Sequence, residues 1–103
     1  MKRIILQACR HSKITSPLAD KDNNIEASLS LVGNQLLVES LLLWQQEYNQ
    51  LPMYSFWSLS HKVDFEREGL RLAQLLCTHL PREIDFSYYS KLYEQEIKFY
   101  QHE

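Results

Sequence analysis

The spacing of apolar residues differs along the chain, and two stretches have the spacing of a helix. In the first, apolar residues recur every three or four positions over 37–51, which places them on one face of a helix. Leucine, glutamine and glutamate, which are common in this stretch, also favour helices. Asn34 can cap the first turn and Pro52 can end the last, so the pattern predicts a helix over 35–50.

The pair Gly33-Asn34 leaves an alternative open for the start of this helix. Gly-Asn is typical of a two-residue hairpin turn, which would lead into a strand rather than a helix. Residues 35–40 are therefore compatible with a strand, although the longer helical spacing favours the helix.

The second helical stretch is predicted over 64–80. Asp64 is a suitable N-cap, and Pro81 stops the helix at its other end. Glu66 and Glu68 fall in the first turn, where the positive end of the helix dipole favours carboxylates. The apolar stripe of this helix consists of Phe65, Leu72, Ala73, Leu76 and Leu80.

The remaining apolar residues have the pattern of strands. A β-branched run indicates an interior strand at the start of the chain, and three further stretches alternate between apolar and polar residues. After a turn near Ser90-Lys91 the alternation resumes as far as Tyr100, which predicts a C-terminal β-hairpin. The polar stretch 10–24 predicts a long loop. The predicted strands before the turn are 3–9, 25–32, 53–60 and 84–89.

Together these elements predict an α+β fold in a single domain covering residues 1–103. We expect two helices packed on a mainly antiparallel sheet of about five strands, with the hairpin at the C-terminal end. A chain of 103 residues, 45% of them hydrophobic, is long enough to bury a core without disulfides or metals.

Charge and targeting signals narrow the classes of function. Eleven basic and 13 acidic residues give a net charge of -2, so bulk charge predicts no nucleic-acid binding. The longest apolar run, Leu41 to Trp44, is far too short to span a membrane. The apolar run at the start ends at Gln7, which is too early for a signal peptide. We therefore expect a cytoplasmic protein that interacts with neither nucleic acid nor membrane.

Cysteine and histidine offer one candidate metal site. Cys9 and Cys77 each lie two residues before a histidine, His11 and His79 respectively, and two Cys with two His could make a zinc tetrad. The spacing differs from that of the common zinc modules, and in a helix Cys77 and His79 lie on different faces. Coincidence is the favoured interpretation, with the cysteines as free thiols, so we expect no metal.

Candidate catalytic residues are few. His61 lies close to Ser58 and Ser60 in sequence, but a catalytic pair must converge in space, and a surface histidine near a helix start is the simpler interpretation. Glu94 and Glu96 would share one strand face, where a solvated surface is favoured over an acid and base pair. No nucleotide-binding or hydrolase motif occurs, so we expect neither a cofactor nor enzyme activity.

The surface of the predicted hairpin is the best candidate for a binding site. Tyrosine gives large, rigid contact area and is enriched in interface hot spots, and carboxylates beside it would complement a basic protein partner. The alternative is that these tyrosines only cover the edge of the sheet and complete the core. The candidate partner-binding residues are Asp85, Tyr89, Glu94, Glu96 and Tyr100.

The run Gly33-Asn34-Gln35-Leu36-Leu37-Val38-Glu39 precedes the aromatic stretch from Tyr54 to Leu59 in a small, mildly acidic α+β chain. In these respects the chain resembles the small immunity proteins of bacterial toxin-immunity systems, particularly those of contact-dependent growth inhibition. The resemblance implies a cytoplasmic inhibitor that binds a cognate toxin domain, for instance a nuclease, and blocks its active site. Immunity proteins are diverse, so no residue roles carry over from the resemblance.

Two other classes of function stay open. A regulator or inhibitor encoded by a phage or mobile element, which also acts by binding protein, would have a similar sequence. A small enzyme is the second alternative, with His61 as the residue whose mutation would reveal it.

Overall fold

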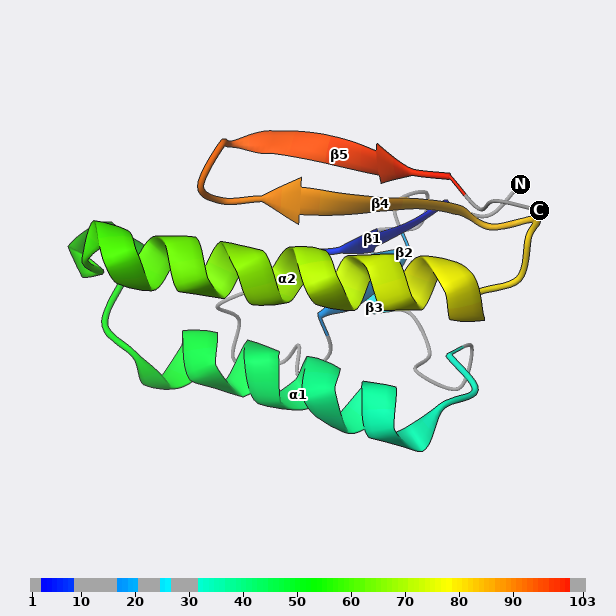
Figure 1. Cartoon of the computed structure of the whole chain (residues 1–103), viewed down its shortest axis with the longest axis horizontal. Helices are drawn as coiled ribbons and strands as arrows, with labels where there is room; N and C mark the ends of the chain where they lie inside the picture. Colours follow the sequence, from blue (N-terminus) through cyan, green and yellow to red (C-terminus); the bar gives the residue numbers. More distant parts are fainter. Residues whose placement is uncertain (1–2, 9–16, 21–24, 27–31, 101–103) are drawn as a thin grey trace.

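The computed structural model describes residues 3–8, 17–20, 25–26 and 32–100, which fold as two helices against a sheet (Figure 1). The elements in chain order are β1 (Arg3–Leu6), β2 (Leu18–Asp20), β3 (Ile25–Glu26), α1 (Gln35–Gln50), the 3₁₀ helix η2 (Tyr54–Phe56), α2 (Leu59–His79), β4 (Asp85–Ser90) and β5 (Gln95–Phe99).

Helix α1 has the boundaries that the apolar spacing predicts. The Asn34 side-chain oxygen accepts a hydrogen bond from the Leu37 backbone N–H at 3.2 Å, and Gly33 has φ of 68°, a conformation that glycine adopts readily. Leu37, Leu41, Trp44 and Tyr48 are buried along one face. The helix is therefore confirmed, and the alternative strand over 35–40 is wrong.

Helix α2 is also confirmed, but it begins five residues before the predicted start. Ser58 is the N-cap in place of Asp64, since its hydroxyl oxygen accepts a hydrogen bond from the His61 backbone N–H at 3.1 Å. The helix ends at His79, just before Pro81.

The predicted strand over 53–60 is wrong, because this segment folds back on itself as η2 and then enters α2. The Trp57 indole N–H donates to the Pro52 carbonyl at 2.8 Å, and the rings of Tyr54 and Trp57 lie 5.0 Å apart. Alternation of aromatic and serine residues has the same appearance in a short turn as in a strand, so the pattern alone was misleading.

The sheet is mixed, which corrects the prediction of a mainly antiparallel one. Its described strands follow the order β3-β2-β1-β4-β5, and the central pair β1–β4 is parallel, with Ile4 beside Phe86 and Leu6 beside Tyr88. The remaining pairs are antiparallel. Both helices lie between β1 and β4 in the chain, and such a long crossover lets the chain return in the same direction.

The predicted strands near the N-terminus are only partly matched. β1 ends at Leu6, and β2 lies within the predicted loop 10–24. Of the predicted strand 25–32, residues 25–26 form β3, 27–31 lie outside the described residues, and Val32 is in a turn. The expected count of about five strands is therefore not confirmed, since four described strands have three or more residues and β3 has two.

The helices and the hairpin together enclose the core. Helices α1 and α2 run antiparallel, and α2 lies alongside β4 (Figure 1). Leu41, Leu72 and Leu76 from the helices are fully buried with Ile4 and Leu6 from β1. Of the helices in the described part of the chain, neither is long and apolar enough to cross a bilayer.

Candidate protein-binding surface

The register of the hairpin decides which of the candidate residues share a surface. Tyr89 pairs with Glu96 and Ser87 with Lys98, and paired residues lie on the same face of an antiparallel ladder. Asp85 lies two residues before Ser87 and four before Tyr89, so its side chain is on the same face of β4 as theirs. The opposite face of β4 is turned toward α2. We call the surface formed by Asp85, Tyr89, Glu94, Glu96, Lys98 and Tyr100 the outer hairpin surface.

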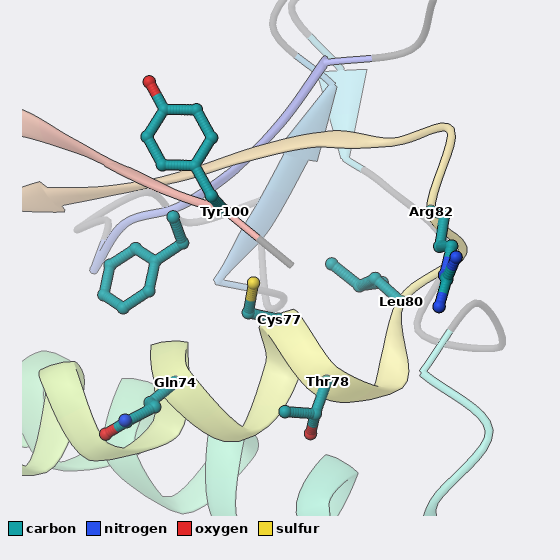
Figure 2. A pocket seen from close by; sticks show the side chains of 7 residues that line it. Gln74, Cys77, Thr78, Leu80, Arg82 and Tyr100 are labelled. Atoms are coloured by element: carbon teal, nitrogen blue, oxygen red, sulfur yellow. The ribbon is translucent and has the colours of Figure 1, made fainter. Parts of the chain in front are cut away.

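Two of the candidate residues lie at the ends of this surface rather than within the strands. Glu94 is in the turn with φ of 54°, so the prediction that Glu94 and Glu96 share a strand face is wrong. A four-residue turn over 91–94 closes the hairpin between Ser90 and Gln95, and Glu94 takes its left-handed position. Tyr100 follows β5 and is 73% exposed, with its ring directed away from α2 (Figure 2).

The outer hairpin surface carries three carboxylates and one ammonium, and the exposed Arg3 of β1 lies beside Asp85, so the net charge of this face is weakly acidic. The carboxylates of Asp85, Glu94 and Glu96 are accompanied by the ammonium of Lys98, whose Nζ is 3.7 Å from Asp85 Oδ2. Both members of this pair are partly exposed, and such pairs contribute at most about 1 kcal/mol. The surface thus combines carboxylates with Tyr89 and Tyr100.

A buried carboxylate joins the inner face of the hairpin to α2. Glu66 is 5% exposed and accepts hydrogen bonds from the Tyr88 hydroxyl at 2.9 Å and from the Ser90 hydroxyl at 2.8 Å. The Ser90 oxygen accepts in turn from the Tyr93 backbone N–H at 3.0 Å. This network extends from the helix to the first residues of the turn, so it fixes the position of the outer surface.

Glu66 is not the first-turn dipole residue that the sequence indicated. Because α2 begins at Leu59, Glu66 is in the third turn and on the buried side of the helix. Gly69 faces the same strand, and a Cβ there would be only 2.5 Å from the Tyr88 hydroxyl oxygen. The spacing of Glu66, Gly69, Ala73 and Leu76 by three or four residues was the signal that could have revealed this face.

Burial and the Glu66 carboxylate raise the pKa of two tyrosine hydroxyls. Burial raises the pKa of the Tyr88 hydroxyl, and the neighbouring Glu66 carboxylate raises it further. The pKa of Tyr54 is raised in the same way, first by burial and then by Glu66. Both tyrosines are therefore neutral at physiological pH, and the Tyr88 hydroxyl donates to Glu66.

An aromatic cluster supports the end of the molecule where the hairpin turn lies. Trp44 stacks on Phe65 with ring centroids 4.6 Å apart, and its indole N–H donates to the Phe65 carbonyl at 3.2 Å. Tyr48 packs against Phe65 at 5.9 Å, and Lys91 Nζ in the turn is 5.0 Å from the Tyr48 ring centroid. The turn is thereby connected to α1 by a cation–π contact as well as to α2 by the Glu66 network.

The residues considered for catalysis do not converge around His61. The imidazole Nε2 is 3.2 Å from Glu47 Oε1, and the ring stacks on Trp57 at 4.6 Å. The Ser58 hydroxyl serves as the helix cap through the His61 backbone N–H, while Ser60 is exposed. His61 therefore interacts with α1 and the aromatic cluster rather than with a serine nucleophile.

The structure describes only one of the two cysteine and histidine pairs that were considered as zinc ligands. Cys77 is buried, which raises the pKa of its thiol, and His79 is exposed at the end of α2. Cys9 and His11 lie outside the described residues. Among the residues that are described, no three or more His, Cys, Asp or Glu side chains gather as metal ligands would.

A cavity of about 370 Å³ lies between the end of α2 and the end of β5 (Figure 2). Cys77 and Thr78 line it from the helix, and Phe99 and Tyr100 line it from the strand side. No pattern along the chain indicates this cavity, since its lining comes from two segments that are distant in sequence.

The chain matches no model of a known protein family, and comparison with curated proteins likewise gives no match.

Proposed function

We propose that this protein is a cytoplasmic immunity protein that binds a cognate toxin domain and blocks it. The observation that carries the proposal is the acidic, tyrosine-bearing outer hairpin surface, in which Tyr89 lies directly opposite Glu96. Asp85 adds a further carboxylate on the same face, and Glu94 adds another in the turn. A basic protein, such as a nuclease domain that holds phosphate, is the complementary partner.

The fixed position of the hairpin supports this role. The Glu66 network and the cation–π contact of Lys91 hold the turn against both helices. A surface that is ordered before binding loses less conformational entropy on association, which strengthens the complex without additional contacts. The tyrosines would supply most of the binding energy, and the carboxylates would speed the encounter.

The experiment is co-purification with the product of the neighbouring gene, followed by kinetics of association with that protein. Reversal of charge in Glu94→Lys/Glu96→Lys should slow association and reduce neutralisation at low salt, because it removes two carboxylates that face the partner. The matched control is Glu39→Lys/Asp64→Lys, which makes the same change of charge at exposed positions on α1 and α2.

The outcomes separate the classes of function. If both double variants bind equally fast, steering comes from bulk charge and the contact surface lies elsewhere. Binding to a partner that is not a toxin would favour a regulator encoded by a phage or mobile element. Turnover that is lost in a folded His61→Ala variant would favour a small enzyme.

A further inference from the structure

Strand β5 is at the edge of the sheet, and no described strand pairs with its outer side. An edge strand offers a row of backbone donors and acceptors to another chain. Natural proteins protect such edges with proline, bulges or charged side chains. β5 has no proline, and its two charged residues, Glu96 and Lys98, have opposite signs, so they repel a second strand only in some registers.

We propose that β5 pairs with β5 of a second copy of this chain to form a symmetric dimer. In an antiparallel pair related by a two-fold axis, Ile97 lies opposite Ile97 of the second copy. Glu96 then lies opposite Lys98 of the second copy, and Lys98 opposite its Glu96. Both ion pairs use the same two residues of β5, so the charges of this edge are complementary to those of an identical edge.

The same charges select this register. A shift of the two-fold axis by one residue in either direction would place Glu96 opposite Glu96 or Lys98 opposite Lys98 across the pair. Like charges directly opposite each other destabilise a strand pair, whereas opposite charges stabilise it. In the remaining registers the two-fold axis passes between two residues instead of through one. Such a register would place a helix-side residue of one copy opposite an outward-facing residue of the other, which a continuous sheet does not allow.

The cavity near β5 is consistent with this arrangement. In the proposed register, the turn of the second copy comes alongside the end of β5, where Phe99 and Tyr100 line the cavity. That turn carries Tyr93, which is 64% exposed. The proposed register therefore brings an exposed aromatic residue of the second copy near the end of β5, and by symmetry the same approach occurs twice.

The dimer is weak by the size of its contact. A pair of five-residue strands buries less than the roughly 800 Å² per partner of a standard interface. We expect a dissociation constant between about 1 μM and 1 mM, which analytical ultracentrifugation of the pure protein measures directly. The toxin is absent from this experiment, so its result is independent of the proposed function.

Charge reversal tests the register, in a common background of Asp85→Asn, which removes the neighbour of Lys98 on its own chain. Glu96→Lys and Lys98→Glu should each weaken dimerisation by about tenfold, because each places like charges opposite each other in both pairs. An equimolar mixture of the two variants should form heterodimers with the affinity of the background protein. The double variant Glu96→Lys/Lys98→Glu should also dimerise at that affinity.

The proposal is overturned if the background protein stays monomeric at about 1 mM, or if the mixture fails to restore association. Equal dimerisation of the single reversals and the background protein would overturn it as well. Hydrogen exchange on the parent chain provides a measurement without any variant: amides of β5 should become more protected as concentration rises. Constant protection of β5 over a range in which the mass doubles would assign the dimer to another surface.

Discussion

The two faces of strand β4 differ in what their side chains contact. On the inner face, Tyr88 and Ser90 donate hydrogen bonds to the buried Glu66, and the Phe86 ring lies 5.9 Å from Phe99. On the outer face, Asp85 and Tyr89 are half-buried. Side chains alternate along a strand, so neighbouring residues of β4 contribute separately to stability and to the proposed recognition. A change one residue along the chain therefore tests the other role.

The same contrast applies to adjacent residues of α2 and gives the largest expected effect. Leu76 is fully buried, whereas its neighbour Leu75 is exposed. Leu76→Ala should lower the free energy of unfolding by about 2–5 kcal/mol, because it leaves a cavity in the core. Urea denaturation measures this change, and Leu75→Ala is the control, with an expected loss below about 1 kcal/mol. Equal losses would mean that the inner side of α2 is wrongly assigned.

The second largest effect on stability is expected when one tyrosine hydroxyl is removed from the inner face of β4, with the outer face as the comparison. Tyr88→Phe should destabilise the fold by about 1–3 kcal/mol, because it takes a hydrogen-bond donor from the buried Glu66 carboxylate. Tyr89→Phe should stay within about 0.5 kcal/mol of the parent. Thermal and urea unfolding of the two variants decides the matter. A larger loss in Tyr89→Phe would reverse the assignment of the faces.

The inner face should also make stability depend on alkaline pH. The pKa of Tyr88 is raised in the folded protein, so the folded state holds this proton more tightly than the unfolded chain does. Its contribution is complete below the unfolded pKa of about 10 and is lost as pH rises above that value. Between pH 7 and about pH 11 the parent should lose more stability in urea than Tyr88→Phe does. Parallel losses would exclude Tyr88 as the source.

The smallest effect is expected on the outer face. Asp85→Asn removes the ion pair with Lys98, whose members are 3.7 Å apart and partly exposed. We expect a change in unfolding free energy of about 0.5 kcal/mol or less, which should vanish at high salt because exposed charges are screened. A loss that persists in 1 M salt would show that Asp85 has a structural role.

Local elements of the fold could be predicted from the sequence, whereas contacts between distant segments could not. Helix α1 and the hairpin follow from spacing, from the Asn34 cap and from alternation, which act within a few residues. The parallel pairing of β1 with β4 depends on how both helices fill the space between them, and no short pattern records that. β2 has only three residues, which is too short for its alternation to be visible.

The candidate site shows the same division. The side of the hairpin on which Tyr89 and Glu96 lie was predictable from period-two alternation. The bend that moves Glu94 out of the strand was not, because it depends on where the turn closes. Glu66 was missed because a carboxylate near a predicted helix start has an obvious surface role, and only Tyr88 and Ser90, more than 20 residues later, make its burial favourable.

The parallel pair at the centre of the sheet has a consequence for the order of events during synthesis. Residues 3–6 pair with residues 85–88, so β1 has no parallel partner until residues 85–88 have been synthesised. The helices and the hairpin can form earlier from local contacts, and closing the long loop between β1 and β4 then limits the rate of folding. We infer that the hairpin becomes fixed in its final position only once β1 has paired with β4.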